Sequence, residues 1–204
     1  MDAENKSKRQ LQAEQTKDNL FIAAVELLTE KDFDDITIRD IVARAQVSIG
    51  TFYNYYSTKM EVFYETYRIA DHYFTETVAP LLSQGTVLER IMAFFDYYAH
   101  YSSDLTDMRM TKLLYNPDNT FFSRDPHQGM VGVLIGILQQ GLDEGALSSD
   151  DSAEEIAEYL MIATRGLVYN WCTCNGSYDL ATATRKFGRR LLACYLPDDA
   201  RPNE

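Results

Sequence analysis

The spacing of apolar residues is the feature that most constrains the fold. Apolar residues recur every three or four positions along most of the chain. This spacing puts them on one face of an α-helix, whereas a half-buried strand requires alternation at every second position. No segment shows such an alternating pattern. The chain of 204 residues is long enough for one or two domains with a substantial core. The sequence therefore predicts an all-α protein of about nine helices.

Turn signals such as Pro80, Gly145 and the Asn175-Gly176 pair separate the predicted helices. The first three helices are expected to form one domain, residues 1–57, and the rest a second domain, residues 58–204. In chain order the helices are expected at about 16–32, 38–45, 49–57, 58–78, 87–101, 108–114, 127–144, 156–171 and 180–194.

Two short helices in close succession mark residues 37 to 59. Thr37 is a suitable N-cap for the first and Ser48 for the second, with only a few residues between them. A short helix, a tight turn and a second short helix form the helix-turn-helix unit that places its second helix in the DNA major groove. This segment is therefore the first candidate for a functional site.

Four aromatic residues crowd the second of these helices. On a helical wheel Phe52 and Tyr56 share one face, while Gly50 and Asn54 lie nearly opposite. We expect the first pair to be core and the second face to be open to a partner, because a glycine lets the backbone approach closely. Ile49 with Tyr53, and Thr51 with Tyr55, occupy the flanks, where hydroxyl groups are suited to phosphate contacts.

Charge bears on the class of partner. The formal net charge of −12 argues against non-specific binding to nucleic acid. Residues 38–59 depart from this trend, since they contain three cations, Arg39, Arg44 and Lys59, and a single acid, Asp40. The N-terminal tail adds Lys6, Lys8 and Arg9, which are expected to reach a minor groove. DNA binding by this chain should thus be local, specific and sensitive to salt.

The remaining composition points to a cytoplasmic protein. No apolar run is long enough for a membrane span, and the first residues lack the apolar centre of a signal peptide. The three cysteines are an odd number and too few for a disulfide framework. No Walker loop, dinucleotide loop or nucleophile elbow is present, so no enzyme activity and no metal or cofactor is predicted.

The motif residues resemble those of a known family. Thr37-x-x-x-Ile41, followed by Ala45-x-Val47-Ser48-x-Gly50-Thr51-x-Tyr53-x-Tyr55-Tyr56-x-x-Lys59, is similar to the DNA-binding signature of the tetracycline-repressor (TetR) family of bacterial transcription regulators. With Leu20, Ala23-Ala24, Leu27-Leu28 and Phe33, the resemblance covers about the first third of the chain. It implies a homodimer that reads a palindromic operator and releases it when a small-molecule effector binds the C-terminal domain.

Three positions depart from the family pattern. Gln46 and Asp32 stand where the family usually has glycine, and Val42 where alanine is common. Aspartate tolerates a left-handed backbone better than glutamine. We expect Gln46 to cost some stability without removing the motif.

The resemblance also implies roles for individual DNA-binding residues. Arg39 is the candidate for bidentate contact with a guanine, and Ile49 for apolar contact with a thymine methyl. The implied phosphate contacts are Thr37, Thr51, Tyr53, Tyr55 and Lys59, and the residues facing base edges are Arg39, Ser48, Ile49 and Gly50, with Asn54 on the same outward face.

Aromatic residues are concentrated in the second domain, which suits an aromatic or amphipathic effector. Arg165, within an apolar stretch, is suited to an acidic ligand, although an ion pair with an Asp or Glu is an equal alternative. The predicted effector residues are Tyr67, Phe94, Tyr98, Tyr101, Tyr115, Met130, Leu134, Arg165 and Trp171. Further aromatics of the same region are Phe95, Tyr97, Phe121, Phe122, Tyr159 and Tyr169.

Two alternatives remain open for the second domain. One is a redox or metal sensor based on Cys172 and Cys174, although their spacing is unlike that of common zinc or dithiol sites. The other is a domain that only dimerises, since stripes on the last two helices suit a four-helix dimer interface. The stripe residues are Leu160, Leu167 and Trp171 on one helix and Phe187 and Leu191 on the other.

Overall fold

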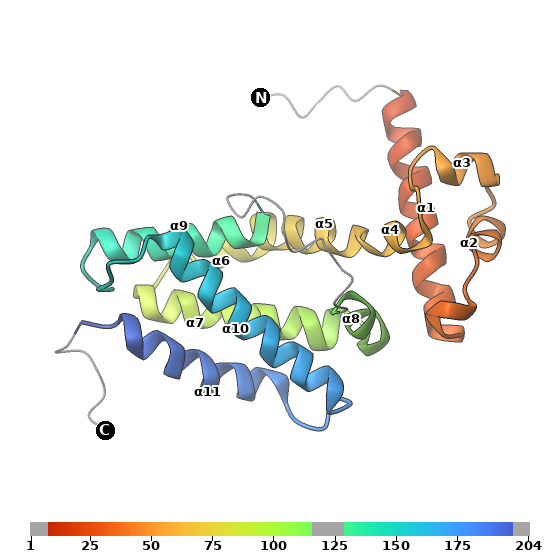
Figure 1. Ribbon diagram of the computed structural model, residues 1–204. Coiled ribbons are helices and arrows are strands. Elements are labelled where there is room, and N and C mark those ends of the chain that lie inside the picture. The colour runs from red at the N-terminus through yellow and green to blue at the C-terminus, as the bar shows by residue number, and fades with distance from the viewer. Residues whose placement is uncertain (1–7, 116–128, 198–204) are drawn as a thin grey trace. The chain divides into compact units, whose positions relative to one another are not determined.

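The computed structural model describes residues 8–115 and 129–197, and every regular element within these ranges is helical (Figure 1). This confirms the predicted all-α class. The α-helices are α1 (Lys8–Glu30), α2 (Ile38–Arg44), α3 (Ile49–Tyr53), α4 (Lys59–Phe63), α5 (Glu65–His72), α6 (Ala79–Leu81), α7 (Val87–His100), α8 (Met108–Leu114), α9 (Gly129–Asp143), α10 (Ala153–Thr173) and α11 (Leu180–Leu192). Short 3-10 helices are η1 (Phe33–Asp35) and η5 (Ala193–Tyr195), and π-helical segments are η2 (Tyr73–Val78) and η3 (Tyr101–Leu105).

The chain divides into two compact units, residues 1–66 and 67–204. The sequence placed this division between residues 57 and 58. It falls later because α4 packs against α1, so that Val62 and Phe63 are fully buried in the core of the first unit. Glu65 at the start of α5 is also held there by an ion pair with Lys17 of α1.

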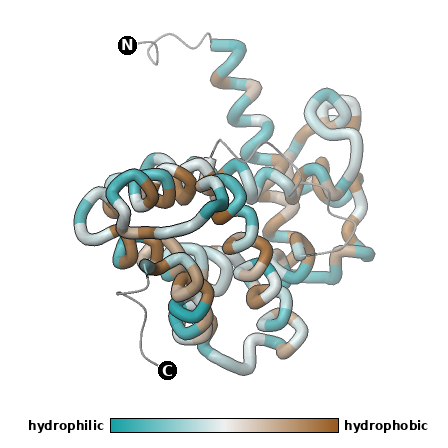
Figure 2. Tube along the Cα trace, turned by 60° about the vertical axis from the view of Figure 1, so that its left-hand side comes forward, coloured by the Kyte–Doolittle hydropathy of each residue, from teal (hydrophilic) through white to brown (hydrophobic). Residues whose placement is uncertain are grey.

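The core of the first unit forms where α1 meets α2 and α4, and α2 meets α3. The buried residues of α1 are those that the periodicity selected, namely Leu20, Ala23, Ala24, Leu27 and Leu28. However, α1 begins at Lys8, well before the predicted start near Thr16. Its first turns are mostly hydrophilic (Figure 2) and bury no side chain, so the apolar spacing could not show that they are helical.

The predicted fourth helix is divided into α4, α5, η2 and α6. The π-helical segment η2 lies immediately before α6, and Pro80 occupies the first turn of α6. Proline is tolerated in a first turn because its missing N–H has no helical partner there. This explains why α6 continues past Pro80 to Leu81, whereas the helix was predicted from the sequence to end before Pro80.

The second unit is built around α7, which packs against both α9 and α11, while α10 packs on α9 and α11. Phe94 and Phe95 of α7 are fully buried in its core. Capping boxes fix the starts of two of these helices, Thr86 with Glu89 at α7 and Ser152 with Glu155 at α10. Of the helices in the described ranges, none is long and apolar enough to cross a membrane.

Candidate DNA-binding face and effector region

The predicted motif forms as α2, a turn and α3, and side-chain caps fix where each helix begins. Thr37 accepts a hydrogen bond from the Asp40 N–H, and the Asp40 carboxylate accepts one from the Thr37 N–H in return. Ser48 caps α3 by accepting from the Thr51 N–H at 3.0 Å. Both caps satisfy amides that the first turn of a helix otherwise leaves unpaired. The short helices are therefore defined locally by the sequence.

Gln46 has a positive φ of 56°, the conformation that glycine favours. The Val47 N–H bonds to the Val42 carbonyl and the Gln46 N–H to the Ala43 carbonyl, which is the Schellman pattern of a helix end. The departure noted in the sequence thus falls on a left-handed residue. Asp32, the other departure, does not: its φ of −68° and ψ of 151° are extended, so no left-handed residue is needed there.

The aromatic residues divide between core and surface as the helical wheel predicts. Phe52 is fully buried and Tyr56 is 4% exposed, whereas Tyr53 is 57% exposed. Tyr55 is half-buried, and Asn54 and Gly50 are exposed. Ile49, an apolar residue, is 43% exposed at the start of α3. The second helix therefore has a buried face and an outward face that is ready for a partner.

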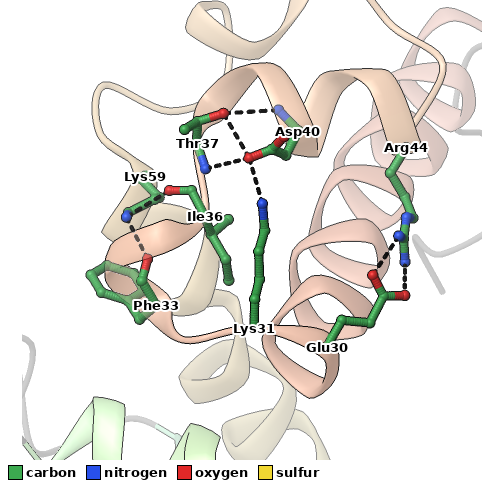
Figure 3. Close-up of polar contacts among 8 residues, drawn as sticks. All are labelled: Glu30, Lys31, Phe33, Ile36, Thr37, Asp40, Arg44 and Lys59. Carbon is green, nitrogen blue, oxygen red and sulfur yellow. Dashed lines mark hydrogen bonds and ion pairs between the residues drawn. The ribbon is translucent and has the colours of Figure 1, made fainter.

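Two of the three local cations are engaged within the first unit (Figure 3). Arg44 donates to both carboxylate oxygens of Glu30 at 2.7 and 2.8 Å, and this contact lowers the pKa of Glu30. Lys59 donates to the carbonyls of Phe33 and Ile36 at 2.6 and 2.7 Å, and lies 4.0 Å from the centre of the Phe33 ring. Lys59, which is predicted to hold a phosphate, fixes the loop that precedes α2 through these contacts. Its partial burial lowers its pKa.

Arg39 differs from these two cations. It is exposed on α2, and no hydrogen bond or ion pair joins it to any described residue. Its guanidinium is therefore available to a partner. Of the predicted basic tail, Lys8 and Arg9 form the first turn of α1, and Lys6 lies outside the described residues.

Four of the predicted effector residues lie together in the second unit. The Tyr98 and Tyr115 hydroxyls are 2.5 Å apart, and the Tyr67 hydroxyl donates to the Leu114 carbonyl at 3.2 Å. Burial raises the pKa of Tyr98 and Tyr115, while the positive charge of Arg165 opposes the rise at both. Residues from α5, α7, α8 and α10 thus meet in one polar cluster inside an apolar core.

The remaining predicted effector residues occupy other places. Tyr101 packs on Tyr73 with ring centres 5.6 Å apart, and burial raises its pKa to about 12. Phe74 contacts both Tyr101 and Phe94, so these belong to an aromatic group. Leu134 is fully buried. Phe121 and Phe122 lie outside the described residues.

Trp171 serves the turn between α10 and α11. Its indole N–H donates to the Tyr178 carbonyl at 3.0 Å, and its ring lies against Gly176. Gly176 has a positive φ of 67°, and a side chain there would collide with Met108. The tryptophan therefore stabilises a turn and does not join the tyrosine cluster.

Sequence reasoning missed Asp71. Its carboxylate accepts a hydrogen bond from the Met130 N–H at 2.9 Å, at the start of α9. A side chain on Gly129 would overlap the carboxylate, since its Cβ would lie 2.3 Å from an Asp71 oxygen. The contact joins residues 59 positions apart, and no local pattern signals it.

The cysteine alternative gains no support from its surroundings. Cys172, Cys174 and Cys194 are all free thiols. Cys172 is buried, which raises its pKa and so disfavours the reactive thiolate. Among the described residues, no group of three potential metal ligands lies close enough together to hold an ion.

An exposed recognition helix after a capped short helix defines a helix-turn-helix DNA-binding protein. Residues 20–66 match the family described as bacterial regulatory proteins, tetR family. No curated protein matches the sequence. The family match covers the helix-turn-helix and the helices around it, so this part of the chain is similar to the DNA-binding region of that family.

Among solved structures, the chain resembles Thermus thermophilus FadR, a TetR-family transcriptional repressor in complex with lauroyl-CoA, with 26% identity and a TM-score of 0.71. The match covers 92% of this chain and 99% of that one. FadR from Bacillus subtilis with stearoyl-CoA is 18% identical over 85% and 96% of the two chains, with a TM-score of 0.67. NalD, a secondary repressor of the Pseudomonas aeruginosa multidrug efflux pump MexAB-OprM, is 17% identical over 91% and 98%, with a TM-score of 0.58. The last two likenesses show the fold alone.

Proposed function

We propose that this protein is a homodimeric repressor that binds a palindromic operator in the bacterial cytoplasm and leaves it when a small-molecule effector occupies the second unit. The outward face of the helix-turn-helix carries this proposal. Arg39 and Ile49 are exposed there, while the neighbouring cations Arg44 and Lys59 are held internally.

The exposed residues divide by the contact they can make with a duplex. Arg39 presents a planar fork that fits the two acceptors of a guanine, and Ile49 offers an apolar surface to a thymine methyl. Ser48 and Gly50 at the start of α3 are assigned to base edges, with Asn54 exposed on the same helix. The hydroxyls of Thr37, Thr51, Tyr53 and Tyr55 are assigned to phosphates, which orient the protein without reading sequence.

Replacement of Arg39 by alanine tests the proposal. A lost bidentate contact costs about 1 to 3 kcal/mol at a specific site, so affinity for the DNA upstream of the protein's own gene should fall about 5- to 150-fold. Affinity for scrambled DNA should change little, because that DNA does not present a guanine at the position that Arg39 reads in the specific site. Fluorescence anisotropy with both duplexes at fixed salt measures the two effects.

Lys112→Gln is the matched control, because it removes a cation from the second unit, where Lys112 bonds to Asn175. This variant should bind both duplexes like the wild type. If the wild-type protein does not distinguish upstream from scrambled DNA, the proposed function is wrong.

The homodimer is proposed to form through the outward face of α10. Tyr159, Ile162 and Tyr169 are 57%, 57% and 50% exposed, and with Gly166 they follow the three-four spacing of a helix-packing seam. A second copy presents the same stripe, as two-fold symmetry requires. The stripe predicted from sequence differs, since Leu160 and Trp171 lie in the core of their own unit.

Two observations support the proposed class of effector. Its apolar core with buried phenols suits an amphipathic or aromatic ligand. The two FadR structures hold acyl-CoA molecules, which are amphipathic. By population shift, such a ligand must bind the DNA-incompetent conformation more tightly than the DNA-competent one.

A further inference from the structure

The outward face of α11 carries the largest local group of cations in the sequence. Arg185, Lys186, Arg189 and Arg190 lie within six residues, and residues 180–197 contain no acid, although the chain as a whole has a net charge of −12. All four side chains are exposed. Figure 1 shows α11 at an edge of the second unit, beside α7 and α10. These four residues form the α11 basic band.

The packing of the opposite face of α11 directs the band outward. The buried residues of α11 repeat every four positions and are Leu180, Thr184, Gly188 and Leu192. Gly188 lies against α7, where an added Cβ would come within 3.4 Å of the Met92 Sδ. Residues four apart share one face of a helix, so the cations are left on the other face. The helix cannot turn the band inward without exposing its packed face.

The charge of the band is compensated at one residue. Arg185 donates to the Asp96 carboxylate of α7 at 2.7 Å. No hydrogen bond or ion pair joins the side chain of Lys186, Arg189 or Arg190 to any described residue. The helix dipole favours cations in the last turn, where Arg189 and Arg190 lie, but Lys186 lies before that turn and repels Arg190 four positions on. An anionic partner would relieve this repulsion.

The surroundings of the band favour phosphate groups over a membrane or a protein surface. The apolar side of α11 is buried, so the helix has no apolar face to insert into a bilayer. Phe187, the aromatic residue within this stretch, is half-buried, so the band has no exposed anchor of the kind that dominates protein interfaces. Three of the four cations are arginines, whose planar fork fits phosphate oxygens in bidentate pairs.

We propose that the α11 basic band is a second, sequence-independent nucleic-acid contact, which binds the phosphate backbone of a duplex. The band extends over about 7.5 Å of the helix axis, and DNA carries one phosphate charge per about 1.7 Å of its own axis, so several phosphates lie within reach. This contact goes beyond the proposed function, because it lies in the second unit and reads no bases. It holds the protein on DNA of any sequence, whereas the helix-turn-helix selects the operator.

Neutralisation of the band tests this contact. The variant Lys186→Gln/Arg189→Gln/Arg190→Gln keeps Arg185, whose ion pair with Asp96 joins α11 to α7. Fluorescence anisotropy of the full-length proteins with the scrambled duplex would be measured from about 25 to 150 mM salt. The variant should bind about tenfold more weakly at the lowest salt. Its slope of log affinity against log salt should be smaller by about 2 to 3, because each phosphate contact contributes about 0.9.

The matched control removes the same number of charges from other exposed positions of the second unit. Arg68→Gln/Arg109→Gln/Lys112→Gln should bind the scrambled duplex like the wild type. Arg189→Lys/Arg190→Lys keeps the charge of the band and should retain most of the affinity. Wild-type affinity and salt slope in the neutralised band variant, or an equal loss in the control, would overturn the proposal.

Two further probes separate nucleic acid from other anions. Polyglutamate and vesicles of phosphatidylserine carry negative charge without a duplex, and neither should depend on the band as strongly as the scrambled duplex does. If the neutralised variant loses its binding to one of these probes and keeps its binding to the duplex, the partner is not nucleic acid and the assignment is wrong.

The preference for upstream DNA separates this inference from the proposed function. The neutralised band variant should bind both duplexes more weakly and still prefer the upstream DNA, whereas Arg39→Ala should lose that preference. A band variant equal to the wild type on scrambled DNA, with the preference intact, would refute the band and leave the repressor standing. Band-dependent binding by a wild type that has no preference for upstream DNA would do the reverse.

Discussion

Gln46 lies in the turn of the helix-turn-helix with a φ of 56°, and it lines a pocket together with Asn19 of α1 and Arg44 of α2. A left-handed backbone costs a residue with a Cβ about 1 kcal/mol or more. The two Schellman hydrogen bonds and the packing of α2 and α3 hold the residue in that conformation. The turn is therefore strained at one residue while its geometry is intact.

Gln46→Gly should stabilise the motif. Relief of the left-handed strain outweighs the larger backbone entropy of glycine in the unfolded chain, for a net gain of about 0.5 to 1 kcal/mol. Hydrogen exchange of peptides covering α2 and α3 should slow about two- to fivefold. Ala43→Gly, on the exposed side of α2 where the backbone is helical, should speed the same exchange. Faster exchange in Gln46→Gly would contradict this account of the turn.

Among the elements, α2 depends on a carboxylate at its start. Asp40 accepts hydrogen bonds from Lys31 at 2.8 Å and from the Thr37 N–H and hydroxyl at 2.8 and 2.7 Å (Figure 3). The Lys31 and Thr37 contacts hold its pKa far below its usual value of 3.8. One side chain thus closes the capping box and ties α2 to the end of α1.

This lowered pKa predicts acid sensitivity. Since the pKa of Asp40 is lower in the folded than in the unfolded protein, its stabilisation is complete above pH 3.8 and is lost as the pH falls below that value. Asp40→Asn should unfold at lower urea concentration than wild type at pH 6, and the difference should shrink at pH 3. Far-UV circular dichroism would follow both transitions.

At the scale of the whole molecule, the outward face of α10 stays exposed to solvent although it carries large apolar side chains. Exposed apolar side chains gathered in a stripe are unusual unless they meet a partner. Ile162 lies near the middle of this stripe, flanked by Tyr159 and Gly166. The proposed dimer would bury it.

Ile162→Asp should convert the protein to a monomer. Its binding to a palindromic operator should weaken, because a monomer binds only one half-site at a time whereas a dimer binds both. Light scattering after size-exclusion chromatography would give the mass of each species. Leu81→Asp introduces the same charge at a similarly exposed position of α6 and should leave the dimer intact. A dimeric Ile162→Asp protein would exclude this face as the interface.

Most of the helix positions could be read from the sequence, because caps and apolar spacing act over a few residues. Thr37 and Ser48 begin their helices as expected, and Phe52 and Tyr56 are core while Tyr53 is exposed. The hydrophilic start of α1 and the π-helical segments η2 and η3 were not foreseen. The π-helical segments interrupt helices without a change in apolar spacing, so no local signal marks them.

The sequence by itself determined the all-α class, the helix-turn-helix and its two-faced second helix, since each follows from spacing and capping between near neighbours. Only the tertiary structure decided which cations face outward. Lys59 is held by carbonyls more than 20 residues away and Arg44 by Glu30, while Arg39 remains exposed. It likewise decided which tyrosines lie together in the second unit, because such contacts depend on how distant helices pack.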